Sequence, residues 1–159
     1  MKKHILLIIV LFSFISCQED VKFNNPSFQG MKDNVFWRAV QTKATIGANG
    51  ALVIEAYTAK EIVTLKTTSK LPQIYTLGTS TAKSVTYVFT DETGSITFAT
   101  GFGIGDGEIK IVEYDAVNNT VTGTFKFNAK NIYNNPLAGP VLNFQQGVFY
   151  KIPITTIGQ

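Results

Sequence analysis

Apolar and polar residues alternate along most of the chain from residue 28 onward, and this period of two predicts β-strands. The clearest example is the segment 120–129, where Val121, Phe125 and Phe127 point to one side and threonine, lysine and asparagine side chains to the other. An antiparallel strand with one face on a hydrophobic core and one in water has this pattern. No segment keeps apolar residues at a helical spacing over three turns, so the pattern predicts an all-β fold.

Nine segments carry such signals, separated by turn residues such as the Asn49-Gly50 pair, which favours a tight turn. About nine hairpin-connected strands predict an antiparallel β-sandwich or barrel, and the sequence leaves both architectures open. We expect residues 28–159 to form this single domain. The expected strands are 35–41, 51–58, 61–68, 74–78, 84–90, 95–100, 108–114, 120–129 and 141–154.

The first sixteen residues depart from this pattern and resemble a signal peptide. Lys2 and Lys3 precede an apolar run over residues 5–15 that Ser13 alone interrupts. A transmembrane helix needs about 20 apolar residues, so this run has the length of a signal-peptide core instead. The run leads into Phe-Ile-Ser-Cys, ending at Cys17, which resembles the lipobox of bacterial lipoproteins.

The lipobox resemblance implies that the Cys17 thiol receives a diacylglycerol, that residues 1–16 are removed and that the new amino group is acylated. Two other interpretations of Cys17 are a lone reactive or intermolecularly paired thiol and a residue of an uncleaved signal anchor. Its position directly after a leader core and a small residue favours lipidation. We therefore expect the membrane to be a partner through the lipid anchor, since more than one acyl chain gives stable attachment.

Residues 17–27 are largely polar, and we expect them to form a tether between the lipid and the domain. Gln18 is not the aspartate that retains many enterobacterial lipoproteins at the inner membrane. Glu19 and Asp20 follow, and this acidic pair resembles the signal that sends Bacteroidota lipoproteins to the cell surface. The expectation is an outer-membrane lipoprotein with its domain on the cell surface; an ordinary polar tether is the alternative.

Removal of the leader also changes the charge and the chemistry that remain. Two of the 14 basic residues leave with it, so 12 face 11 acidic residues, a net charge of +1. The lysines are scattered and Arg38 is the only arginine, so no nucleic-acid partner is expected. His4 is the only histidine and Cys17 the only cysteine. The mature domain therefore lacks a Ser-His-Asp triad, a Cys-His pair and a zinc site of imidazole or thiolate, and we expect no cofactor.

Several blocks of the chain resemble a family of uncharacterised Bacteroidota lipoproteins that is defined by a domain of unknown function. The most specific block runs from 107 to 129, and the resemblance covers residues 28–154. It implies an all-β fold and an envelope location, and it carries over no catalytic residues. The blocks are Phe36-Trp37-Arg38-Ala39, Tyr75-Thr76-Leu77-Gly78, the 107–129 block with Tyr114-Asp115 and Gly123-Thr124-Phe125-Lys126-Phe127, Gly147-Val148-Phe149 and Ile152-Pro153-Ile154.

Two features suggest ligand chemistry at first sight. The glycine-rich segment 101–107 precedes a strand rather than a helix, so we interpret it as a strand-crossing or hairpin loop and not as a phosphate-binding loop. Asp106, Glu108, Glu113 and Asp115 could supply oxygen ligands to Ca²⁺, with Asp106 and Asp115 as the candidate pair, but the spacing does not match an EF-hand, and solvated turn carboxylates are the default interpretation. Alternation predicts that Glu108 lies on the face opposite Glu113 and Asp115.

Aromatic side chains are the other candidates for binding. Trp37 alternates with Val35 and Ala39, which predicts a core position. Phe36 lies on the other face with Arg38, and these two residues form the possible ligand surface that the sequence indicates. Tyr57, Tyr75, Tyr87, Tyr133 and Tyr150 could extend an aromatic platform for sugar rings or a partner chain.

We expect a non-enzymatic envelope lipoprotein whose β domain binds a glycan or another envelope protein. One alternative is a hydrolase, for example a glycosidase, that acts through two carboxylates; another is a purely structural envelope module. A hydrolase requires a deep pocket where two or more acids converge, whereas a binding module requires a shallow apolar or aromatic surface.

Overall fold

The computed structural model describes residues 27–156, and within that range it contains eleven β-strands and no helix. No helix in this part of the chain is long and apolar enough to cross a membrane. The all-β prediction is confirmed. The strands are β1 (Ser27–Lys32), β2 (Val35–Arg38), β3 (Gln41–Ile46), β4 (Leu52–Tyr57), β5 (Glu61–Thr67), β6 (Gln73–Thr76), β7 (Ser84–Asp91), β8 (Gly94–Ala99), β9 (Asp106–Asp115), β10 (Thr120–Asn131) and β11 (Val141–Thr156).

Two of these strands, β1 and β3, were not among the nine expected. β1 turns into β2 through Asp33 and Asn34, both with positive φ (47° and 66°), which makes a two-residue hairpin without the glycine that usually signals one. The expected strand 35–41 ends at Arg38 because the chain bends at residues 39–40 before β3 begins. β3 buries fully only Ala44, so its sequence shows little hydrophobic alternation.

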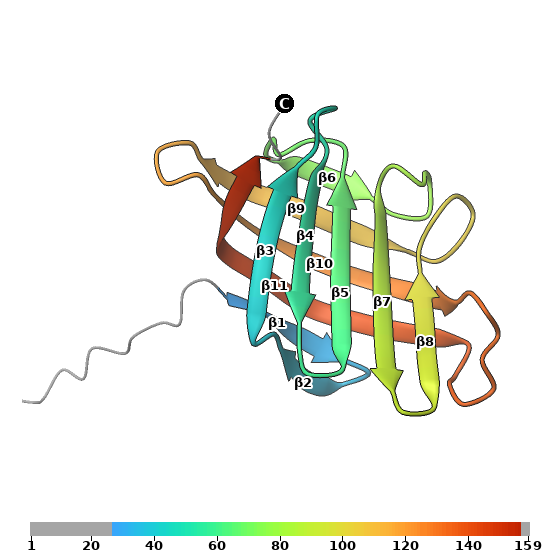
Figure 1. Ribbon diagram of the computed structural model, residues 1–159. Coiled ribbons are helices and arrows are strands. Elements are labelled where there is room, and N and C mark those ends of the chain that lie inside the picture. The colour runs from blue at the N-terminus through green and yellow to red at the C-terminus, as the bar shows by residue number, and fades with distance from the viewer. Residues whose placement is uncertain (1–26, 157–159) are drawn as a thin grey trace, which may run out of the picture.

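All eleven strands belong to one hydrogen-bonded sheet, folded into two layers that face each other like a sandwich. β3, β4, β5, β7 and β8 form one layer, and β2, β1, β11, β10, β9 and β6 form the other, whose strands cross behind the first at a steep angle (Figure 1). Two long strands join the layers at their ends: residues 154–156 of β11 pair in parallel with β3, and Lys130 and Asn131 of β10 pair with β8. Strands that change layer in this way are typical of steeply crossed sheets.

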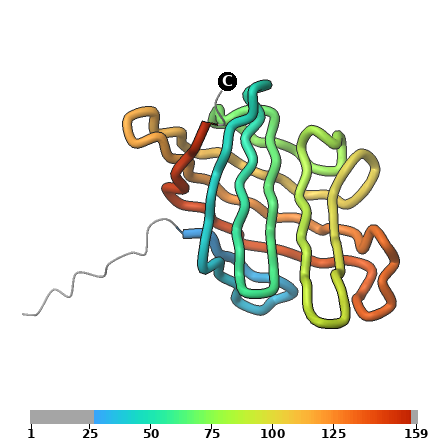
Figure 2. The backbone as a smooth tube through the Cα atoms, viewed as in Figure 1, coloured from blue at the N-terminus to red at the C-terminus, as the bar shows by residue number. Residues whose placement is uncertain are grey.

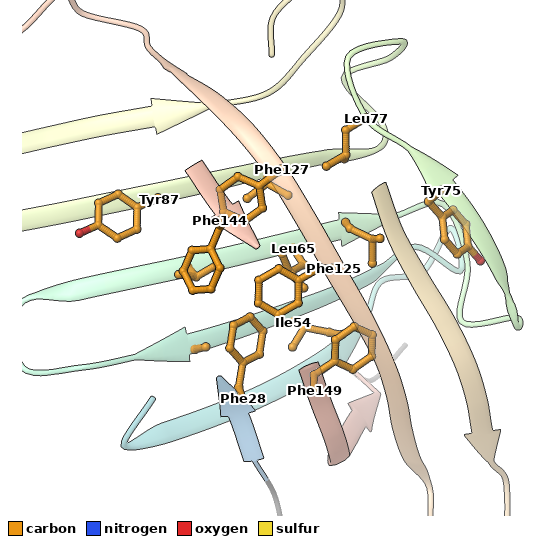
Figure 3. Packing of buried hydrophobic residues seen from close by; sticks show 14 of the residues in the cluster. Phe28, Ile54, Leu65, Tyr75, Leu77, Tyr87, Phe125, Phe127, Phe144 and Phe149 are labelled. Carbon is orange, nitrogen blue, oxygen red and sulfur yellow. The ribbon is translucent and has the colours of Figure 1, made fainter. Parts of the chain in front are cut away.

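The core lies between the layers and is dominated by phenylalanine. Phe28, Phe125, Phe127, Phe144 and Phe149 are at most 2% exposed (Figure 3). The Phe125 ring centre lies 4.6 Å from that of Phe28, 5.2 Å from that of Phe144 and 6.1 Å from that of Phe127, the spacing of favourable aromatic pairs. Because these residues come from β1, β10 and β11, one layer contributes most of the aromatic volume, and leucine, isoleucine, valine and alanine of the other layer pack against it.

Three glycines in the strands of this layer leave room for those rings. A Cβ on Gly147 would lie 2.5 Å from the Phe125 ring, and one on Gly123 would lie 2.3 Å from the Phe149 ring and 2.2 Å from the Lys110 carbonyl oxygen. A Cβ on Gly30 would lie 2.5 Å from the ring of Phe144. The neighbouring strands therefore accept each ring where a side chain is absent, which is the close approach that glycine permits within a sheet.

We predict that Gly123→Ala lowers the free energy of unfolding by about 1–3 kcal/mol or more, because overpacking displaces a ring and a backbone carbonyl together. The control is Gly139→Ala, since a Cβ there would meet its nearest neighbour, the Val141 carbonyl oxygen, at 4.0 Å. Urea unfolding of both variants measures the difference. Equal stability of the two variants would show that the core adapts at Gly123.

Candidate functional site

The described part of the chain contains one partly buried cluster of ionisable side chains, centred on Glu61 at the start of β5. The Glu61 carboxylate accepts hydrogen bonds from Lys32 Nζ of β1, from Trp37 Nε1 of β2 at 2.6 Å and from the Tyr87 hydroxyl of β7 at 2.5 Å. Thr58 Oγ1 donates a fourth bond at 3.2 Å. Lys32 Nζ also donates to the Tyr87 oxygen at 3.0 Å. We call these five residues the Glu61 cluster.

The Glu61 cluster perturbs two pKa values. Burial disfavours the charged form of Glu61, but the hydrogen bonds from Lys32, Tyr87 and Trp37 together outweigh burial, so the pKa of Glu61 lies below its ordinary value of 4.5. Burial, followed by the hydrogen bond to the Glu61 carboxylate, raises the pKa of the Tyr87 hydroxyl. Glu61 is therefore ionised and Tyr87 protonated at neutral pH.

The role of the Glu61 cluster is structural, because its acceptors and donors are already used. Both oxygens of Glu61 have partners, and Lys32 and Trp37 reach it from the opposite layer of the sheet. The nearby carboxylate, Asp33, accepts a hydrogen bond from the Asn143 backbone N–H at 2.9 Å. Glycoside hydrolysis requires two carboxyl groups flanking the bond, one of them a general acid with a raised pKa, whereas this cluster holds a single carboxylate whose pKa is lowered.

The candidate calcium residues, Asp106 and Asp115, do not come together. They lie at the two ends of β9, a ten-residue strand, so about 30 Å separates them. Asp106 accepts a hydrogen bond from Asn128 Nδ2 at 2.7 Å, and Asp115 accepts backbone N–H bonds from Val117 and Asn118 in the following turn. The calcium alternative is wrong for this pair, and no group of three or more potential metal-ligating side chains occurs between residues 27 and 156.

The expectation that Glu113 lies opposite Glu108 is also wrong. A β-bulge at Val112 shifts the register of β9, so that Glu113 pairs with Thr122 while Ile111 pairs with Gly123. Glu113 therefore lies on the outer face, as Glu108 does opposite Lys126. An inserted residue reverses the alternation that follows it, and sequence alternation alone does not reveal it.

The glycine-rich segment is a loop between layers, as expected. Gly101 and Ile104 bridge each other, and Gly103 N–H donates to the Gly78 carbonyl at 2.9 Å. The segment leads from β8 in one layer to β9 in the other, and Phe102 at its tip is 76% exposed. No helix follows, so its N–H groups do not form a phosphate site.

A shallow, open depression of about 400 Å³ lies in the loop between β10 and β11. Asn131, which is 8% exposed, organises this loop. Its Nδ2 donates to the Asn135 carbonyl oxygen at 2.9 Å, and its Oδ1 accepts the Asn135 N–H at 3.1 Å. The Asn131 N–H also donates to the Pro140 carbonyl oxygen at 3.0 Å, which closes the loop. The lining residues are Lys130, Asn131, Asn134, Asn135, Pro136, Ala138 and Pro140.

Several groups around this depression are available to a ligand. The Asn134 side chain and the Asn135 Nδ2 make no hydrogen bond within residues 27–156, whereas the Asn135 Oδ1 accepts one from the Leu137 N–H at 2.9 Å. Tyr133 and Leu137, each 74% exposed, belong to the same loop but not to the lining of the depression. The sequence indicated Tyr133 as one of several aromatics but did not reveal the asparagine-lined depression, because the hydrogen bonds of Asn131 form it.

The surface that the sequence indicated lies on β2, at an edge of the sheet. Phe36 is 61% and Val40 is 83% exposed, and Arg38 is exposed between them. Trp37 is 6% exposed, which confirms the expected core position. Tyr75 and Tyr87 are buried and so belong to no exposed platform.

Cys17, Gln18, Glu19 and Asp20, which carry the expected anchor and export signal, lie outside the described residues.

Comparison with known proteins identifies one family. The model of the domain of unknown function DUF6252 matches residues 24–153, which is 130 of the 159 residues. No curated protein matches the chain. No solved structure matches it either.

We predict that Glu61→Gln lowers the free energy of unfolding at pH 7 by about 1–3 kcal/mol, because Lys32 loses its counterion. Since folding lowers the pKa of Glu61, the stability it contributes is complete above 4.5 and is lost as the pH falls through the folded-state pKa. The wild type and the variant should therefore converge in acid. Urea unfolding between pH 7 and pH 3, with Glu92→Gln in an exposed turn as the control, measures this; a constant difference across the range would contradict the prediction.

Proposed function

The chain belongs to the family defined by the domain of unknown function DUF6252, and because that description names no activity, we propose a function from the chain's own geometry. The protein is a non-catalytic lipoprotein of the bacterial cell envelope that binds a neutral carbohydrate in the loop between β10 and β11. The observation that carries this proposal is the preformed, amide-lined depression in a loop that also holds the exposed Tyr133.

Carbohydrates present both hydroxyl groups and apolar C–H faces. Amide side chains can donate to and accept from hydroxyl groups, and Asn134 and Asn135 supply such groups at the depression. The exposed ring of Tyr133 offers a flat apolar face for stacking together with a polar hydroxyl. Lys130 is the one ionisable residue of the lining, so the depression disfavours a cation, and its amide groups suit the hydroxyl groups of a neutral carbohydrate.

The loop is also preorganised, which favours binding. Asn131 anchors both the N–H and the carbonyl oxygen of Asn135, and Ala138 N–H donates to the same carbonyl at 3.2 Å. The side chains that face a ligand therefore project from a backbone that is already ordered, which reduces the entropy lost on binding.

The hydrolase alternative has less support. The depression contains no carboxylate among its lining residues, and the buried carboxylate of Glu61 is saturated with hydrogen bonds. A glycosidase would need two acids flanking the ligand. A carbohydrate bound in this loop would be held rather than cleaved.

The envelope location rests on the sequence. The lipobox-like segment ending at Cys17 supports a lipid anchor, and Glu19 and Asp20 support export of a Bacteroidota lipoprotein to the outer surface of the outer membrane. A domain with a preformed loop for carbohydrate suits that surface, where polysaccharides are met first.

We predict that Tyr133→Ala combined with Asn134→Ala weakens carbohydrate binding about thirtyfold, because a stacking contact and a hydrogen bond each contribute about 1 kcal/mol. An array of neutral bacterial and plant oligosaccharides identifies the probe, and titration calorimetry with the strongest binder measures the loss. Phe102→Ala, which removes an exposed aromatic from another loop, should bind as the wild type does.

Binding that survives the double substitution would place the ligand elsewhere. Release of new reducing ends from the bound oligosaccharide would show catalysis and would overturn the non-catalytic assignment.

We predict that protease added to intact cells cleaves the wild-type domain, whereas Glu19→Ala with Asp20→Ala protects it without lowering its total amount. The physical reason is that the acidic pair lies in the tether, where an export machine can reach it and where the fold does not depend on it. Immunoblots before and after cell lysis provide the measurement. A wild-type domain that is cleaved only after lysis faces the periplasm.

A further inference from the structure

Three apolar side chains that the fold leaves uncovered lie in or just after β2, the edge strand that pairs with β1. Val35, Phe36 and Val40 are 65%, 61% and 83% exposed, and all three lie within six consecutive residues. Phe36 and Arg38 share one face, because they alternate with the core-facing Trp37, and Val40 follows them in the bend before β3. We call Phe36, Arg38 and Val40 the β2 face.

The β2 face is uncovered because β2 is the last strand of its layer. β2 pairs with β1 alone, with Phe36 opposite Met31 and Arg38 opposite Gln29. No described strand lies beyond it, so its second edge carries backbone groups that are not paired within the sheet. Exposed apolar edge strands promote association unless something covers them.

The chain enters β1 at Ser27, close to the Val40 end of the β2 face. The Ala39 N–H donates to the Phe28 carbonyl oxygen at 2.9 Å, so Val40 lies one residue beyond a direct contact with the second residue of β1. Ten peptide steps separate Cys17 from Ser27, and a chain of that length spans at most about 35 Å when fully extended.

We propose that the β2 face rests on the lipid bilayer that holds the acylated Cys17, an inference that depends on the anchoring part of the proposed function. Phe36 and Val40 insert among the lipid headgroups, and Arg38 binds lipid phosphate. The short tether makes this contact intramolecular, so side chains too few to bind a membrane alone contact it at a high effective concentration.

The charge of the face agrees with this occupant. Arg38 takes no part in the three ion pairs formed by the described residues, which join Lys32 to Glu61, Lys43 to Glu55 and Lys126 to Glu108. A guanidinium group binds phosphate through two parallel hydrogen bonds while its stem lies along apolar surface. An apolar pair flanking one free arginine is suited to the boundary between headgroups and acyl chains.

The test uses the full acylated protein with single cysteines at three positions, because the thiol of Cys17 is blocked by lipid. Phe36→Cys and Val40→Cys lie on the β2 face, and Phe102→Cys is the matched control on the exposed tip of the loop between β8 and β9, on another side of the molecule (Figure 1). Each is labelled with an environment-sensitive fluorophore and reconstituted into vesicles of phosphatidylethanolamine and phosphatidylglycerol, with and without brominated acyl chains. Urea unfolding confirms that each labelled variant is folded.

We expect blue-shifted emission and quenching by brominated lipid at positions 36 and 40, and neither effect at position 102. Equal quenching at all three positions, or no quenching at 36 and 40 while the vesicles float with the protein, overturns the β2-face inference and leaves the anchor intact. If the protein does not float with the vesicles and carries as little palmitate label as the Cys17→Ala variant, the lipid anchor itself is overturned. Shielding of positions 36 and 40 in cells but not in vesicles identifies a partner protein as the occupant instead.

Discussion

The structure depends on the fit of phenylalanine rings into gaps that strand glycines leave in the same layer of the sheet. Phe125 of β10 occupies the space at Gly147 of β11, and Phe149 of β11 occupies the space at Gly123 of β10. Each long strand therefore receives a ring of the other, and the contact is reciprocal. Close packing of this kind tolerates little change of volume, so the rings and glycines together determine the register of the two strands.

That register has consequences beyond the core. Bulges along β10 and β11 shift their pairing between Val121 and Gly123 and between Phe125 and Phe127, so the strands bend as they run. Bending lets the end of β11 reach β3 and the end of β10 reach β8, and the two layers become one sheet. The Glu61 cluster then joins the layers near the β1–β2 hairpin, where polar groups meet the aromatic core and must be paired.

Much of the strand content could be predicted from alternation, because one face of each strand is buried. Segment 120–129 shows this best: its apolar residues face inward as expected. The features that escaped prediction depend on single backbone conformations. Gln146 and Lys151 adopt positive φ within β11, and neither residue type signals a bulge. The hypothesis that Asp106 and Asp115 bind one calcium ion was wrong for a related reason. Both residues lie in a single extended strand, which separates its residues by about 3.3 Å per position.

The depression between β10 and β11 could not be predicted from alternation either. In the sequence, Asn131 looks like an ordinary polar residue at the end of an alternating strand. In the structure it is 8% exposed, and its side chain shapes the loop that follows. A polar residue so deeply buried is informative only when its partners are known, and those partners are backbone groups four and more residues away. Exposed Phe36 and Tyr133 could be identified as candidates from sequence, whereas what surrounds each of them required the fold.

The long strand β11 relates the two proposed surfaces to each other. Its Tyr150 pairs with Ser27, where the tether enters, and its first residue, Val141, follows the loop that holds the depression. Nine residues of strand separate these points, or about 30 Å. Figure 2 shows the start of β1 and this loop on opposite sides of the molecule. Because a packed strand sets this distance within the domain, the loop between β10 and β11 lies far from the residue at which the chain enters β1.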